Sequence, residues 1–407
     1  MELSRQYLVD MEIAKQLMYR LGKWEYSGLC LLVIVILAMH LSTIMQPAEL
    51  VFDEQYYVGD ARSILQGEDV LRPEHPPLGT LLITSGIFLF GDNPVGWRFF
   101  SILFGIIGIV LFYLICRRLE LPKMASFLAT FLLALDNLSF VQASIAMLDV
   151  YSVTFMLLSF WLYLRGQYLL SGLSVGLSAL AKLSGVLALP VILLHWLLTK
   201  RGRPIKFVAT MLSAYAAFPL LLSLFDFVAF RQFVNPLDRI YTMLSLSGKL
   251  TFTTAAHGGA SHPWDWILRP EIIAYWYEPR YVGAISFTIW ALIIPAVLYM
   301  AFRATKGNTA GFFGISWFAS TYLVWIPISI ITDRISFVYY FYPTVGAICI
   351  GLGLGLSQLL AIWKTRETGK LRWVAVSSVT GYLLLHISVF VILSPVFSHW
   401  ITLPTAQ

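Results

Sequence analysis

Apolar segments of membrane-crossing length recur along most of the chain, with short polar connections between them. They occupy residues 29–45, 97–115, 124–135, 150–164, 168–180, 186–198, 207–230, 282–302, 311–331, 337–362 and 373–393. The pattern predicts an all-α polytopic membrane protein with about 11 transmembrane helices. The four segments within 124–198 are shorter than the roughly 20 residues that a simple span requires, which indicates tilted, broken or re-entrant helices there.

The two ends of the chain differ from this apolar body. Residues 1–26 alternate apolar and charged positions at near-helical spacing, which predicts an amphipathic helix lying in the membrane interface. No cleavable signal peptide is evident, because the first long apolar run follows a charged stretch. We therefore expect one transmembrane domain over residues 27–395 and a short outer tail over residues 396–407.

Two polar connections are much longer than the others, at about residues 46–96 and 231–281. Both are rich in aromatic residues, proline and histidine. Long segments in a compact protein are usually either functional or disordered, and this composition favours order. We expect these two outer segments to form the functional site.

Composition and charge place the segments relative to the membrane. Hydrophobic residues make up 58% of the chain, charged residues make up 12%, and the mean hydropathy is +0.76, which excludes an ordinary soluble domain. If the N-terminus is cytoplasmic, most of the 28 lysines and arginines fall in cytoplasmic loops, and both outer segments face away from the cytoplasm. The net charge of +6 then reflects topology and predicts no nucleic-acid partner.

An acidic pair, Asp53 and Glu54, follows the first apolar segment. Charge at the edge of a bilayer is costly and usually functional, so the pair points to chemistry at the membrane surface. The simpler interpretation is that the two carboxylates only solvate the membrane edge. The motifs around the pair favour an enzyme.

These motifs resemble those of the protein O-mannosyltransferase family of polytopic, polyprenyl-phosphate-dependent glycosyltransferases. The similarity extends from about Phe52 to Pro343, and the order and spacing of its parts agree together. The matching stretches are Phe52–Tyr57, His75–Gly79, Asp136–Ser144 with Leu148 and Asp149, Ala181–Gly185, Ser261–Trp264, Leu268–Pro270 and Arg334–Pro343.

The resemblance implies a C-type membrane glycosyltransferase fold that uses a lipid-linked sugar phosphate on the non-cytoplasmic face and inverts the anomeric carbon of the sugar. Mannose is expected only because of this resemblance. Two departures bear on the acceptor and the source. Gln55, Tyr56 and Tyr57 replace the usual aromatic and histidine pattern, and the large soluble lumenal insert of eukaryotic members is missing. The second departure favours a prokaryotic plasma membrane over the endoplasmic reticulum.

Transfer from a sugar phosphate needs a base for the acceptor hydroxyl and positive charge for the departing phosphate. We expect Asp53 to be the base, with Glu54 assisting it, orienting the acceptor or holding the loop. The candidate phosphate-binding cations are Arg98, Lys182 and Arg334. Guanidinium suits phosphate, and a lysine in an apolar stretch is costly unless it is paired or functional. The alternative is that these side chains only extend to the membrane interface.

Further polar and aromatic residues are candidates for positioning the substrates. They are His75, Asp149, His262, Trp264 and Arg269. His75 precedes two prolines that hold an extended backbone. Asp149 begins an apolar segment on the outer side, where it would either position the catalytic loop or pair with one of the candidate cations. The aromatic residues of the second outer segment either belong to the interfacial belt or line a sugar groove. Asp136, with Asn137, is interpreted as a side-chain cap that terminates the preceding helix.

This chemistry requires no cofactor, and a divalent metal ion is the weaker alternative. Imidazole and carboxylate form a known ligand set, which Glu54, His75 and His262 would supply, but no tight histidine spacing supports it. The three cysteines lie inside apolar runs and offer neither metal-ligand spacing nor a disulfide framework.

Three functions compete as interpretations. The first is transfer of mannose from a dolichyl or undecaprenyl phosphate, embedded in the bilayer, to serine and threonine hydroxyls of exported proteins. The second is the same lipid-linked chemistry with a glycolipid, lipid A or polysaccharide acceptor. The third is a transporter or lipid-binding scaffold, which would show inverted repeats and charges at the membrane midplane. Here the charges gather at one membrane face, so we favour the first.

Overall fold

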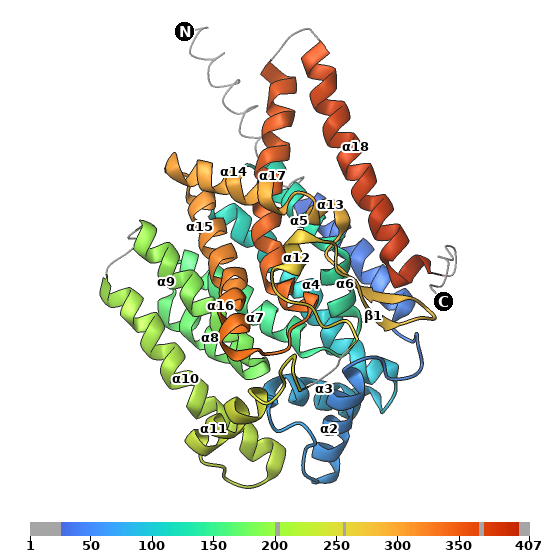
Figure 1. Ribbon diagram of the computed structural model, residues 1–407, viewed down its shortest axis with the longest axis vertical. Helices are drawn as coiled ribbons and strands as arrows, with labels where there is room; N and C mark the ends of the chain where they lie inside the picture. The colour runs from blue at the N-terminus through green and yellow to red at the C-terminus, as the bar shows by residue number, and fades with distance from the viewer. Residues whose placement is uncertain (1–25, 200–203, 255–257, 366–369, 399–407) are drawn as a thin grey trace, which may run out of the picture.

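The computed structural model describes residues 26–199, 204–254, 258–365 and 370–398, and its regular elements are helical except for one two-stranded sheet (Figure 1). The predicted all-α class is thus confirmed apart from that sheet. The interfacial helix predicted for residues 1–26 lies outside the described residues except for Tyr26. Residues 399–407 of the predicted outer tail lie outside them too.

Six helices of the described residues are long and apolar enough to cross a membrane. They are Tyr26–Thr43, α4 (Pro94–Arg118), α10 (Pro204–Phe230), the continuous run of α15 (Thr309–Phe318), η2 (Ala319–Leu323) and α16 (Trp325–Thr332), the run of η3 (Val338–Phe341) and α17 (Tyr342–Thr365), and α18 (Lys370–Leu393). A seventh span results if α5 (Lys123–Ala134) and α6 (Asn137–Ser144), bent by 58°, are taken together. The count of about 11 included shorter segments and stays a prediction.

The other helices are shorter. They are α2 (Glu54–Gln66), α3 (Pro77–Phe90), α7 (Leu148–Leu164), α8 (Tyr168–Ala181), η1 (Leu183–Leu187), α9 (Ala188–Thr199), α11 (Pro236–Ser247), α12 (Asp265–Leu268), α13 (Phe287–Trp290), α14 (Ile293–Thr305) and η4 (Pro395–Phe397). The first long polar segment therefore contains two helices, α2 and α3, whereas the second contains α11, the short α12 and strand β1. Figure 1 shows α2, α3 and α11 gathered at the end of the molecule opposite the upper part of α17 and α18.

The apolar run 282–302, predicted as one helix, is broken. Its beginning forms strand β2 (Tyr281–Gly283), which pairs antiparallel with β1 (Ile273–Trp276), before α13 and α14 follow. The break has a polar cause. The Asp136 carboxylate caps α6 by accepting from the Ser139 N–H, and its other oxygen accepts from the Ser286 N–H, both at 2.9 Å. Asp136 is a helix cap, but it caps the start of α6, whereas the sequence predicts a cap at the end of the preceding helix α5.

Small residues let neighbouring helices approach closely, as expected for packing within a membrane. At Gly172 in α8, a Cβ atom would lie 1.9 Å from the Ser213 Oγ of α10 and 2.3 Å from the Thr210 carbonyl oxygen, so only glycine fits. Helix α8 also packs against α7. This second contact brings the start of α7 beside the end of α8, where the site lies.

A buried ion pair joins the acidic segment to the helix bundle. The Arg98 guanidinium of α4 donates to both carboxylate oxygens of Glu54 at 2.9 Å, and neither side chain is exposed. Its remaining N–H groups donate, at 2.9 to 3.2 Å, to the carbonyl oxygens of Ile44, Pro47 and Glu49. All five N–H groups of the guanidinium are therefore used.

Glu54 is saturated in the same way. Besides the two bonds from Arg98, its oxygens accept from the backbone N–H groups of Val51 at 3.1 Å and Ala146 at 2.8 Å. This geometry argues against two predicted roles. Arg98 has no donor left for a phosphate, and Glu54 has no exposed oxygen for catalysis, so the structure supports only the expectation that Glu54 holds the loop.

Replacement of Arg98 by methionine should destabilise the protein severely, because it leaves the buried Glu54 carboxylate without its cation. Breaking such a pair typically costs about 3–5 kcal/mol. The matched control is Arg62→Met, which breaks a half-exposed pair with Asp92 and should cost no more than about 1 kcal/mol. Thermal unfolding in detergent measures both. If Arg98→Lys instead unfolds like wild type and loses affinity only for a lipid phosphate, Arg98 is a ligand after all.

Candidate active site

Asp53 lies at the N-terminal end of α2, immediately before the buried Glu54. Its side chain makes no capping bond to the helix, and one oxygen accepts from the Tyr57 hydroxyl at 3.4 Å. Burial raises the pKa of Asp53 above its ordinary value, while the nearby Lys182 charge acts to lower it. The preceding residue, Phe52, has φ 49°, which costs a non-glycine residue about 1–3 kcal/mol.

A second carboxylate, Asp149, lies close to Asp53 at the start of α7. Both of its oxygens accept from the Lys182 ammonium, at 2.8 and 2.7 Å, and Lys182 follows directly after α8. The ammonium also lies 5.2 and 5.4 Å from the ring centroids of Tyr339 and Tyr340. The structure thus pairs two predicted site residues and places the charge of Lys182 near Asp53.

A cavity of about 300 Å³ opens beside this cluster. Its polar lining residues include five that carry or can carry charge: Glu74, His75, Asp149, Lys182 and Arg334. Tyr57 connects Asp53 to the cavity, because its ring meets the His75 ring edge-on at 5.4 Å. The remaining walls are mostly aliphatic and aromatic, so charged groups here act in a medium with little water.

His75 is neutral in this setting. Burial, together with the neighbouring cations, lowers its pKa to about 3. The loop that carries His75 is held by Arg239 of α11, whose guanidinium donates to the carbonyl oxygens of Pro73 and His75 and pairs with the buried Asp226. A neutral imidazole can both donate and accept a hydrogen bond, which suits contacts with sugar or acceptor hydroxyls.

Arg334 also lines the cavity, in the stretch between α16 and η3. Its guanidinium donates to the Ser247 carbonyl oxygen at the end of α11, and its backbone pairs with Thr251. No carboxylate forms an ion pair with Arg334 within the described ranges. Its charge is therefore available to an anion in the cavity.

The other predicted positioning residues lie apart from this cavity. His262 stacks on Trp264 at 4.5 Å and lies within hydrogen-bond reach of the Ser329 hydroxyl. Arg269 is exposed and pairs with Asp265 and Glu271. None of these three side chains lines the cavity.

The residues proposed for a metal ion are not brought together. Glu54 is bound to Arg98, whereas His75 lines the cavity and His262 stacks on Trp264. In the part of the chain that the structure describes, no three histidine, cysteine, aspartate or glutamate side chains are grouped as metal ligands.

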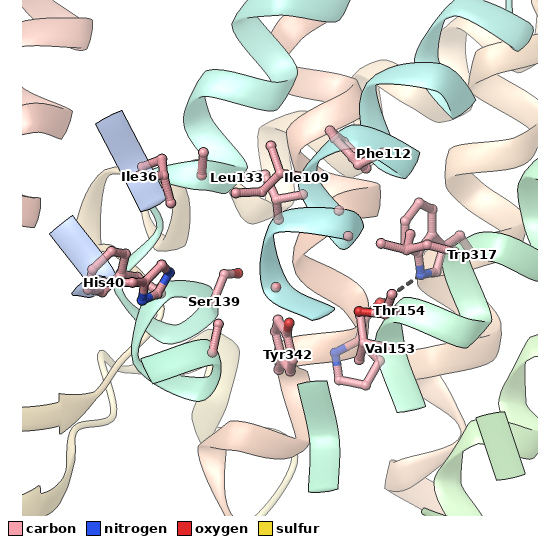
Figure 2. A pocket seen from close by; sticks show the side chains of 18 residues that line it. Ile36, His40, Ile109, Phe112, Leu133, Ser139, Val153, Thr154, Trp317 and Tyr342 are labelled. Carbon is pink, nitrogen blue, oxygen red and sulfur yellow. Dashed lines mark hydrogen bonds between the residues drawn. The ribbon is translucent and has the colours of Figure 1, made fainter. Parts of the chain in front are cut away.

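A second cavity, of about 40 Å³, lies inside the helix bundle (Figure 2). Its walls are mainly apolar and aromatic, and His40 lies beside Ser139 at one end, with Trp317 at the other. His40 stacks on Phe140 and contacts the Ser144 hydroxyl at 3.1 Å. Because no carboxylate, lysine or arginine lines this space, it is a packing gap and lacks the chemistry of the larger cavity.

Three residues that contribute to the larger site were not among the predictions: Tyr57, Tyr340 and Arg239. Tyr57 follows Asp53 by four positions, a spacing that brings side chains together on a helix. Tyr340 lies in the stretch Arg334–Pro343, whose aromatic content was visible. Arg239 had no comparable signal, because its partners in the loop before α3 are distant in sequence.

Comparison with known proteins agrees with the resemblance found in the sequence. A family model described as dolichyl-phosphate-mannose-protein mannosyltransferase matches residues 74–248. The polyprenol-phosphate-mannose–protein mannosyltransferase of Mycolicibacterium smegmatis is 35% identical over 27% of this chain, a match that spans only 22% of that protein. The enzyme of the same name from Corynebacterium glutamicum is 22% identical over 93% of this chain and 90% of its own length.

Solved structures show the same fold. The S. cerevisiae protein O-mannosyltransferase Pmt1–Pmt2 complex, bound to the sugar donor, is 11% identical with a TM-score of 0.74, covering 92% of this chain and 90% of its own. ArnT from Cupriavidus metallidurans, bound to undecaprenyl phosphate, is 18% identical with a TM-score of 0.55, covering 91% and 74%. The matched family model, the relatives and the fold are thus all similar to those of protein O-mannosyltransferases.

Proposed function

We propose that the protein transfers mannose from a polyprenyl-phosphate mannose to serine or threonine hydroxyls of proteins, with Asp53 as the general base. The observation that carries the proposal is the position of Asp53. It lies near the Asp149–Lys182 pair, which lines the adjacent cavity together with His75 and Arg334. The relatives that are named for this reaction support the choice of sugar and acceptor.

The proposed step is a single displacement. The acceptor oxygen forms a bond to the anomeric carbon while the bond from that carbon to the phosphate oxygen breaks. Asp53 takes the proton of the acceptor hydroxyl, and polyprenyl phosphate leaves with the bonding electron pair. Attack opposite to the leaving group inverts the configuration. No general acid is needed, because a phosphate is already a good leaving group.

Of the predicted phosphate ligands, Arg334 fits best. The charge of Lys182 is balanced by Asp149, whereas Arg334 has no carboxylate partner among the described residues. A guanidinium binds phosphate through two parallel hydrogen bonds, and here it would stabilise the charge that develops on the leaving group. Lys182 then serves mainly to keep Asp53 ionised. The neutral His75 is suited to contact sugar hydroxyls.

We also propose that the cavity faces away from the cytoplasm, in a prokaryotic plasma membrane. Helix α14, which carries Arg303 in its last turn and is followed by Lys306, lies near the opposite end of the molecule from α2 and α11 (Figure 1). Lysine and arginine accumulate in cytoplasmic loops. Their position supports an external location for Asp53.

Replacement of Asp53 by asparagine should lower the kcat for mannosyl transfer by about 10²- to 10⁴-fold, the contribution typical of a general base. Asparagine keeps the shape of the side chain, so the Kd for polyprenyl-phosphate mannose should change little. The measurement is transfer of radiolabelled mannose to a Ser/Thr-rich peptide by purified protein. Asp69→Asn, which removes an exposed carboxylate from the same outer segment, should behave as wild type.

Each other outcome of this assay is informative. Normal turnover by Asp53→Asn removes the assignment of the base. Transfer by wild type to a glycolipid, but to no peptide, removes the protein acceptor and keeps the lipid-linked chemistry. Absence of transfer to either class, with intact binding of donor lipid, removes mannose or both acceptors from the proposal.

The pH dependence of transfer should report the environment of Asp53. The base must be ionised, so kcat should fall as pH drops through its pKa, and burial places that acidic limb above the ordinary aspartate pKa of about 3.9. Lys182→Met removes a charge that lowers the Asp53 pKa, so the limb should move to higher pH at saturating donor. Arg62→Met, which breaks the half-exposed pair with Asp92, should leave it in place. A limb unmoved by Lys182→Met contradicts the assignment.

Orientation in the membrane is tested with single cysteines in a protein lacking the native cysteines. Glu68→Cys, on the exposed turn after α2, should react with a membrane-impermeant thiol reagent in intact cells. Lys306→Cys, on the exposed turn after α14, should react only after lysis. The reverse pattern would place Asp53 on the cytoplasmic side.

A further inference from the structure

Asp53 is held in place mainly through its neighbours. Its side chain has one hydrogen bond among the described residues, the 3.4 Å contact from Tyr57, and does not cap α2. The direction of the carboxylate therefore depends on the backbone on each side. On the C-terminal side, Glu54 is fixed by Arg98 and by two backbone N–H groups.

On the N-terminal side, the strained residue Phe52 is held by two aromatic rings. Its ring stacks on Tyr275 of β1, with centroids 4.3 Å apart and planes inclined by 20°. It also meets Tyr339 of η3 edge-on at 5.8 Å, and the two tyrosine rings lie 6.4 Å apart. We call these three rings the aromatic clamp. A bulky residue keeps a φ of 49° only where its surroundings enforce it, and the clamp supplies that enforcement.

Tyr275 is itself held by a specific hydrogen bond and by a close fit against the paired strand. The buried Gln142 of α6 donates from Nε2 to the Tyr275 hydroxyl at 2.8 Å, while its amide oxygen has no hydrogen-bond partner among the described residues. On the paired strand β2, a Cβ atom at Gly283 would lie 2.8 Å from the same hydroxyl, so glycine leaves room for it. Burial and the nearby carboxylates raise the pKa of Tyr275 well above its usual value, which keeps the hydroxyl neutral.

We propose that Tyr275 is a positioning residue for the general base. Its ring, oriented by Gln142, holds Phe52 in the strained backbone conformation that directs the Asp53 carboxylate toward the acceptor. Through Tyr275 of β1, the second outer segment therefore restrains the base, which lies in the first outer segment. This inference rests on the proposed function of Asp53.

The test compares two substitutions of Tyr275 that separate its ring from its hydroxyl. Tyr275→Leu removes the ring and should lower kcat about 10²-fold, the effect of a displacement near 1 Å at a reacting group. The Kd for polyprenyl-phosphate mannose should stay within about twofold, because the donor cations are untouched. Tyr275→Phe keeps the ring on Phe52 but loses the bond from Gln142 that orients it, so kcat should fall, though less than in Tyr275→Leu.

The control for general loss of packing is Tyr163→Leu. Tyr163 is equally buried, contacts His195, and lies near the far end of α7, about 20 Å from Asp149 by the rise of the helix. This variant should unfold at a lower temperature but keep its kcat per folded molecule. If Tyr275→Leu behaves the same way, or loses donor affinity in place of kcat, Tyr275 has only a structural role.

Phe52→Gly provides a second route to the same answer if Tyr275→Leu does not fold. Glycine accepts the positive φ without strain, so folding should survive while the clamp loses its central ring. The kcat should fall as in Tyr275→Leu, and Phe52→Tyr, which keeps a ring, should restore it. Normal kcat in folded Phe52→Gly overturns the proposal.

A readout independent of transfer separates this inference from the proposed function. Hydrogen–deuterium exchange of the backbone amides at residues 53–57 should be faster in Tyr275→Leu than in wild type, and unchanged in Tyr163→Leu. If wild type transfers no mannose but this exchange responds as expected, the clamp stands and the reaction assignment falls. If exchange in Tyr275→Leu equals that of wild type, the clamp does not hold Asp53.

Discussion

The buried pair between Arg98 and Glu54 is the interaction on which the rest of the site depends. Taking two charges out of water is costly, and the cost is offset here because every guanidinium N–H and both carboxylate oxygens have partners. Those partners belong to the segment after the first described helix, to α2, to α4 and to the connection between α6 and α7. One ion pair therefore fixes the relative positions of four parts of the chain, and Asp53 is covalently next to it.

This arrangement divides the work of two adjacent carboxylates. Both oxygens of Glu54 already accept hydrogen bonds, so this residue holds the surrounding segments in place. Asp53 has one long hydrogen bond from Tyr57 and can still accept a proton. Consecutive residues at the start of a helix point in different directions, so one carboxylate enters the bundle and the other stays near the cavity. The aromatic clamp adds a second restraint, because Phe52 and Glu54 then hold the backbone on both sides of Asp53.

The helical class and the acidic pair could be predicted from the sequence, because each depends on local pattern or on a family motif. Pairing with a cation was only one of two roles that the sequence left open for Asp149. The role of Arg98 as the buried partner of Glu54 could not be predicted from the sequence. An arginine at the start of a span is equally consistent with a phosphate ligand and with a buried partner, and only contacts across 44 positions decide between them. The break near Ser286 in the apolar run was not predicted for the same reason, because it depends on a hydrogen bond to Asp136, which is distant in sequence. Span count and residue roles in catalysis depend on the membrane and the substrates.

The proposed reaction uses two kinds of cation around the cavity. Lys182 is paired with a carboxylate, whereas Arg334 has no carboxylate partner among the described residues. Asp53 and Asp149 offset Lys182 and Arg334 when all four are ionised. During the proposed step, Asp53 loses its negative charge as it takes a proton, and the departing phosphate gains one, so the total charge stays constant while its position moves across the cavity. In a medium with little water, such movement is favourable only when fixed positive charge lies near its destination. Arg334, free of a carboxylate partner among the described residues, supplies that charge, and Lys182 stabilises the starting state.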